Sequence, residues 1–143
     1  MRGYVQHVDL VPMLFELLKI NVEKVCLDGV SLLKSLETGN TVREFSYLEE
    51  SYTERKYAIV KDGYKLIMAP KREDALCRYC SIVHGDIKEL YDLRRDPEEQ
   101  NNIIYEEYDI AKELEKELSL FHKQLIRSRL SRKIKRLKHK LSV

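Results

Sequence analysis

The chain has 143 residues, of which 43% are apolar and 35% are charged, and its formal net charge is only +2. This length suits one domain with a modest core, and this composition excludes wholesale disorder. The near balance of charge does not indicate nucleic-acid binding over the whole surface, and no apolar run reaches the ~18 residues that predict a membrane span.

Two helices are predicted near the N-terminus. The first, DLVPMLFELLKI, begins at Asp9, which can act as its N-cap, and Pro12 is tolerable only in a first turn. Its apolar residues cover almost the whole circumference, and such a helix is normally covered on several sides. The second helix, SLLKSLE, ends at Gly39.

Four strands are predicted after these helices. Asp62-Gly63 is the preferred two-residue hairpin turn and joins the second strand to the third. A long polar loop separates the third strand from the fourth. The strands are REFSYLEE (43–50), KYAIV (56–60), YKLIMA (64–69) and KELYDL (88–93).

The charged stretch RRDPEEQNN follows the last strand. Asp96 is predicted as an N-cap, Pro97 as the first helical residue, and Glu99 as the third residue of a capping box. Two asparagines then stop the turn in left-handed geometry, and two isoleucines anchor it in a core. These are Asn101, Asn102, Ile103 and Ile104. We interpret the stretch as a structural turn, and a ligand site is the alternative.

One long helix is predicted from about Tyr108, because apolar residues recur every three or four positions without Gly or Pro. As one helix it is about 50 Å long. The seam consists of Ala111, Leu114, Leu118, Phe121 and Leu125, followed after a one-residue slip by Ile126, Leu130, Ile134, Leu137 and Leu141. His122 and His139 are expected to face solvent.

Charge is unevenly distributed along this helix. Residues 106–117 carry six acidic side chains, whereas 125–143 carry eight Lys or Arg and no acid. This order favours an antiparallel pair of helices from two copies of the chain. There are two alternative arrangements for this helix: it docks on the sheet of its own chain, or its last turns fray in solution. The tail could also bind an anionic membrane surface or a nucleic acid, but it has no aromatic residue after Phe121, which weakens both readings.

Three segments in a fixed order resemble the C-terminal part of the sulfatase family, within the alkaline-phosphatase-like superfamily. They are VQHVDLVPMLFELLKI (5–20), LDGVSLLKSLETG (27–39) and LYDLRRDPEEQNNI (90–103), with the strand YKLI between the last two. The resemblance covers about Val5 to Leu118. It implies a small domain with a four-stranded antiparallel sheet packed on a helix.

The predicted fold class is therefore α+β, with a small four-stranded antiparallel sheet packed with helices and a long C-terminal helix. We expect three segments along the chain. Residues 1–40 resemble the end of the sulfatase main domain, 41–105 form the sheet subdomain, and 106–143 form the long helix with its basic tail.

The chemistry that the resemblance implies lies outside this sequence. Sulfatases use a formylglycine made from Cys or Ser in a C/S-x-P-x-R motif, with a divalent metal held by Asp and Asn residues. Here Leu10, Met68 and Arg95 stand two residues before the prolines, so the nucleophile is absent. The family's metal ligands lie upstream, and the HVD pattern at His7 and Asp9 starts a structural helix in the family. We therefore expect no catalytic, cofactor-binding or family metal residue in this chain.

Cys77, Cys80 and His84 form a C-x2-C-x3-H pattern and are candidate zinc ligands. Zinc usually takes four protein ligands in a structural site, and Cys26 is a fourth only if the loop folds back onto it. A reversible disulfide and plain loop thiols are the alternatives. Three cysteines make no disulfide framework and MRGYVQHVDL is not a signal peptide, so we expect a cytoplasmic protein.

Three hypotheses of function follow. The first is the C-terminal subdomain of a sulfuric ester hydrolase, inactive alone, as a split-gene product, a remnant, or one half of an enzyme with a separate N-terminal half. Its first helix would then have an interface formed by Leu10, Leu14, Phe15 and Leu18. The second is a non-enzymatic interaction module that forms homo-oligomers through the long helix. The third is a small zinc-binding module.

Overall fold

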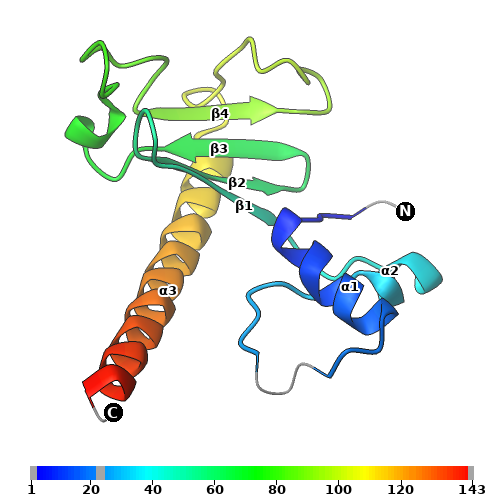
Figure 1. Ribbon diagram of the computed structural model, residues 1–143. Coiled ribbons are helices and arrows are strands. Elements are labelled where there is room, and N and C mark those ends of the chain that lie inside the picture. The colour runs from blue at the N-terminus through cyan, green and yellow to red at the C-terminus, as the bar shows by residue number, and fades with distance from the viewer. Residues whose placement is uncertain (1–2, 22–24, 142–143) are drawn as a thin grey trace.

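A computed structural model describes residues 3–21 and 25–141 of the chain. The elements are η1 (His7–Asp9), α1 (Leu10–Leu17), α2 (Leu33–Thr38), β1 (Ser46–Glu50), β2 (Lys56–Lys61), β3 (Tyr64–Met68), η2 (Arg72–Ala75), β4 (Lys88–Asp92) and α3 (Tyr108–Leu141). The predicted α+β class, with one antiparallel sheet and a long C-terminal helix, is confirmed (Figure 1). Within the described ranges no helix is both long and apolar enough to cross a bilayer.

The four strands form an antiparallel meander in the order β1-β2-β3-β4. The predicted hairpin turn is confirmed, because Asp62 and Gly63 have φ values of 50° and 81°. Both values lie in the left-handed region that a type I′ turn requires. The turn fixes the register, in which Leu66 stands opposite Ile59 on one side and Leu90 on the other.

This row of three residues is the centre of the hydrophobic core. Ile59, Leu66 and Leu90 are at most 1% exposed, and Leu118 of α3, fully buried, belongs to the same cluster. The predicted anchor residues of the turn, Ile103 and Ile104, pack against the cluster. Its other buried members are Tyr57, Met68, Ala111 and Leu114. The sheet and the first half of α3 therefore share one core.

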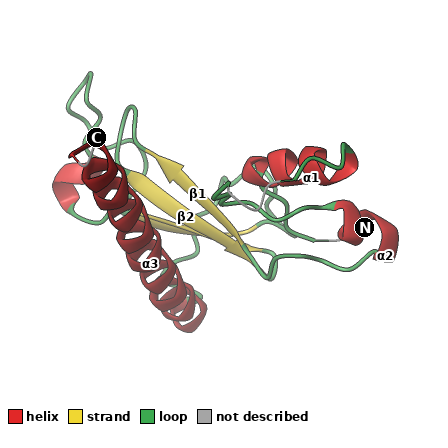
Figure 2. Cartoon of the chain, turned by 60° about the horizontal axis from the view of Figure 1, so that its bottom comes forward, coloured by secondary structure: helices red, strands yellow, loops and turns green. Residues whose placement is uncertain are grey.

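The second half of α3 projects beyond the sheet (Figures 1 and 2). The apolar spacing correctly predicts the helix, but the seam is covered only along its first half. Ile126, Leu130, Ile134 and Leu137 are all exposed. The expectation that His122 is solvated is wrong, because its ring stacks on Tyr57 at 4.2 Å. The side chain of His139 lies outside the described residues.

Helices α1 and α2 lie side by side and apart from α3 (Figure 2). Helix α1 ends at Leu17 rather than Ile20. Lys19 turns the chain with φ 55°, and the Ile20 N–H donates to the Phe15 carbonyl at 2.8 Å. This is a Schellman-like end without glycine, which is why the sequence concealed it. Helix α2 ends at Gly39 with φ 75°, as predicted.

Candidate functional site

Asp9 occupies the N-cap position of α1, as predicted, but its side chain makes no capping hydrogen bond to that helix and is fully buried. Its carboxylate accepts hydrogen bonds from Gln6 N (3.0 Å), Val30 N (2.9 Å) and Arg43 Nε (2.8 Å). Burial alone raises the pKa of Asp9, but these hydrogen bonds outweigh it and lower the pKa to about 2. Strand β1 accordingly starts at Ser46 and not at Arg43, whose side chain binds Asp9.

The turn after β4 forms without the predicted helix and capping box. The Asp96 carboxylate accepts hydrogen bonds from Gln100 N (3.0 Å) and Asn101 N (2.8 Å). Glu99 pairs with Lys65 Nζ at 2.7 Å and adopts φ 56°. Because Lys65 takes the Glu99 carboxylate, no reciprocal cap can form at this end.

The end of the same turn is fixed to β4. The Asn102 side chain accepts the Leu90 N–H at 2.9 Å, and Ile103 N donates to the Leu90 carbonyl at 2.9 Å. The left-handed residue is Glu99, not Asn101 or Asn102 as predicted. The acidic groups of the turn thus make contacts within the protein, which favours the structural interpretation over a ligand site.

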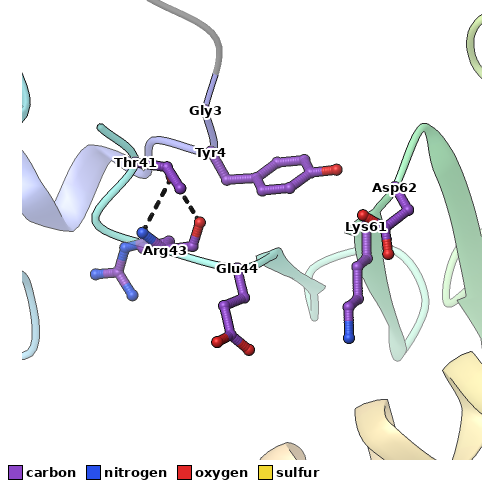
Figure 3. A pocket seen from close by; sticks show the side chains of 7 residues that line it. All are labelled: Gly3, Tyr4, Thr41, Arg43, Glu44, Lys61 and Asp62. Carbon is purple, nitrogen blue, oxygen red and sulfur yellow. Dashed lines mark hydrogen bonds between the residues drawn. The ribbon is translucent and has the colours of Figure 1, made fainter. Parts of the chain in front are cut away.

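A surface cavity of about 560 Å³ lies between the N-terminal segment and the β2–β3 turn (Figure 3). Its lining residues are Gly3, Tyr4, Thr41, Arg43, Glu44, Lys61 and Asp62. Thr41 Oγ1 donates to the Arg43 carbonyl at 2.6 Å. Both cationic side chains of this lining already have anionic partners, because Arg43 binds Asp9 and Lys61 Nζ lies 2.8 Å from Glu117. We assign no chemistry to this cavity.

A larger cleft of about 820 Å³ separates the N-terminal segment and β1 from α3. Two ion pairs connect α3 to the opposite side of the cleft. Arg129 lies 3.0 Å from Glu49 of β1, and Arg132 lies 2.7 Å from Asp28. These arginines of the basic tail therefore have acidic partners in their own chain, which leaves less positive charge for pairing with a second copy.

One side of α1 is an exposed apolar surface, which we call the α1 face. It consists of Leu10, Leu14, Leu17 and Leu18, which are between 47% and 65% exposed. Their spacing places them on one stripe of the helix. Leu17 takes the place of the predicted Phe15, which is half-buried. A contiguous apolar patch on a soluble protein marks an interaction surface more often than a single exposed leucine does.

The three predicted zinc ligands lie together in the loop between β3 and β4. The Cys77 and Cys80 sulfurs and a His84 ring nitrogen are all within 4.8 Å of one another. Hydrogen bonds from the backbone N–H groups of Cys80 and Tyr79 lower the pKa of Cys77 to about 7 against the effect of burial. Cys26 is not part of the group and lies instead beside Arg132.

The family model described as "N-sulphoglucosamine sulphohydrolase, C-terminal" matches residues 1–125. No curated protein matches the chain. Among solved structures, BT4656 in complex with its substrate D-glucosamine-2-N,6-O-disulfate is 26% identical over 81% of this chain and 23% of that chain, with a TM-score of 0.61. BT33336S-sulf of Bacteroides thetaiotaomicron, described with the metabolism of multiple glycosaminoglycans, is 28% identical over 79% of this chain and 24% of its own, with a TM-score of 0.59.

A putative sulfatase from Bacteroides fragilis, yidJ, shares the fold at 19% identity and a TM-score of 0.57, over 79% of this chain and 23% of its own. The chain thus spans about a quarter of the length of these solved structures. The family model covers most of the chain, and these solved structures share its fold over 79% to 81% of its residues. The chain therefore belongs to the N-sulphoglucosamine sulphohydrolase C-terminal family, the C-terminal portion of the sulfatases.

Proposed function

We propose that this chain is the C-terminal subdomain of a hydrolase of sulfated sugars and that it has no hydrolytic activity alone. The α1 face carries the proposal, since a main catalytic domain would cover these leucines in a complete enzyme. The sequence supports it, because no proline among the 143 residues follows Cys or Ser at the C/S-x-P spacing. The sugar class is supported by the names of BT4656's substrate and of the matching family.

In this proposal the predicted segments have distinct roles. Residues 1–40 complete the main domain and present the α1 face to it, and the Asp9–Arg43 contact holds this segment to the sheet subdomain of residues 41–105. Within residues 106–143, the first half of α3 packs on the sheet and the second half projects beyond it. The main domain would come from a separate N-terminal half or from a longer polypeptide.

The divalent metal that sulfatases use would be held by that main domain. Hard cations prefer carboxylate and carbonyl oxygens. Within residues 3–21 and 25–141, the one group of three or more close His, Cys, Asp or Glu ligands is Cys77, Cys80 and His84. Sulfur and imidazole donors do not suit a hard cation, so this group is not a fit for the family's metal.

We also propose a cytoplasmic location. All three cysteines, Cys26, Cys77 and Cys80, are free. Free thiols persist in a reducing compartment, whereas secreted domains of this size commonly carry disulfides.

Assay of the chain with an aryl sulfate, with and without calcium or magnesium, is expected to show no turnover above a mock purification. The reason is the missing nucleophile motif. A related complete sulfatase is the positive control, and the same enzyme with its C-terminal subdomain replaced by this chain should keep measurable turnover. Activity that follows this chain quantitatively through two purification steps would overturn the proposal.

The alternative function, oligomerisation through the long helix, is favoured by the exposed leucines and isoleucines beyond Leu125. One experiment separates it from the α1 interface. Light scattering of the isolated chain is expected to show self-association that Leu14→Glu reduces and Leu130→Glu does not, because Arg129 and Arg132 of α3 already pair with acidic residues of their own chain. Both leucines are about half exposed, 47% and 55%, so neither substitution disturbs a core. The opposite pattern would favour the helix-pairing module, and a monomer that neither substitution alters would argue against both.

A further inference from the structure

The loop between β3 and β4 places three soft ligands at one point. Cys80 Sγ lies 3.0 Å from His84 Nε2, and both lie with Cys77 Sγ inside a 4.8 Å group. Tetrahedral zinc, with bonds of about 2.3 Å to sulfur and about 2.0 Å to nitrogen, needs its ligand atoms about 3.5–3.8 Å apart. The three side chains therefore need only small adjustments to share one ion.

A tight backbone turn brings the two cysteines together. The Ser81 N–H donates to the Cys77 carbonyl at 2.8 Å, and Ser81 is left-handed with φ 58°. The turn reverses the chain after Cys77 and leaves the Cys77 and Cys80 sulfurs within 4.8 Å of each other. Two cysteine sulfurs at this separation can bind the same zinc ion.

Both ends of the loop are held by the sheet subdomain, so the ligands are positioned before any metal binds. The Arg78 N–H donates to the Thr53 carbonyl at 2.8 Å, beside the start of β2. Lys56 Nζ donates to the His84 carbonyl at 2.8 Å and also lies 3.0 Å from Glu54. Ligands held by a rigid scaffold bind a metal with a smaller ordering cost.

We propose that Cys77, Cys80 and His84 bind one zinc ion, with the fourth position open to water or to an outside donor. Cys77 is only 7% exposed, whereas Cys80 and His84 are exposed, so the open position faces solvent. Two thiolates and one imidazole favour Zn²⁺ over calcium or magnesium. The site is distinct from the sulfatase chemistry proposed above and does not depend on it.

Cobalt titration of the full chain under a non-thiol reductant tests the site, because tetrahedral Co²⁺ bound to thiolates has intense charge-transfer and visible bands. We expect one Co²⁺ per chain, displaced by Zn²⁺, and a higher Tm with zinc. Removing a residue that hydrogen-bonds to a metal ligand, without binding the metal itself, typically weakens metal binding about 10- to 100-fold. Losing a ligand itself, by Cys80→Ser or His84→Gln, is expected to weaken it by more than about 100-fold.

Cys26→Ser is the matched control, since Cys26 is an exposed thiol outside the group and should bind Co²⁺ like the wild type. The exposed ligands are substituted rather than buried Cys77, and far-UV circular dichroism confirms that each variant is folded. If the reduced wild type shows no thiolate–cobalt bands, the proposal is wrong. This holds also if the oxidised protein forms a Cys77–Cys80 disulfide, because the two thiols would then pair with each other without binding a metal. Wild-type affinity in Cys80→Ser, or equal losses in Cys26→Ser and Cys80→Ser, overturns it as well.

Discussion

Replacing Asp9 with alanine is expected to lower the free energy of unfolding by about 3 kcal/mol, the usual cost of breaking a buried ion pair from one side. Asp9 is fully buried, and the side chain of its partner Arg43 is only 18% exposed. The substitution leaves that guanidinium with no counter-charge and removes the acceptor for Val30 N. Urea denaturation followed by circular dichroism measures the loss.

Asp28→Ala is the matched control. Asp28 also pairs with an arginine, Arg132 at 2.7 Å, but its side chain is 57% exposed. An exposed ion pair contributes at most about 1 kcal/mol. If the two variants unfold at the same urea concentration, the Asp9 contacts do not hold the N-terminal segment to the sheet.

The contribution of Asp9 also predicts a pH dependence. Its pKa in the folded chain is about 2, below its ordinary 3.8, so the unfolded chain binds more protons between these values. The stabilisation is therefore complete above about pH 4 and lost as the pH falls toward 2. The difference in unfolding free energy between the wild type and Asp9→Ala should shrink over this range, and a constant difference contradicts the assignment.

Leu118→Ala is expected to lower the free energy of unfolding by about 3 kcal/mol, because it opens a cavity where α3 meets the sheet. Leu118 has no exposed surface and belongs to the core cluster with Ile59, Leu66 and Leu90. Thermal unfolding monitored by far-UV circular dichroism should show a lower midpoint for helix and sheet together, since they share this core.

Leu120→Ala provides the comparison within the same helix, because Leu120 is 58% exposed. The two substitutions change helix propensity equally, so only burial distinguishes them. A change within about 0.5 kcal/mol is expected for Leu120→Ala. Similar losses for both variants would mean that α3 is not docked through Leu118.

Features that depend on neighbouring residues could be predicted from the sequence. The Asp62-Gly63 turn has a left-handed backbone that these residue types tolerate, and α3 follows a spacing that only a helix places on one side. The motif order identified the sulfatase C-terminal portion, and the spacing of Cys77, Cys80 and His84 marked a possible metal site. In each case the relevant residues lie close together in the chain, so local backbone geometry decides the outcome.

The partner that each polar side chain takes depends on the tertiary fold. Asp9 binds Arg43 instead of capping α1, and Glu99 pairs with Lys65 instead of closing a capping box. Both partners are 34 residues away, and a local pattern cannot show them. The sequence also could not show that the Cys77 sulfur is buried and receives backbone N–H groups, or that half of the α3 seam stays uncovered. Local propensity is a weak preference, and a charged or apolar partner brought close by the fold readily outweighs it.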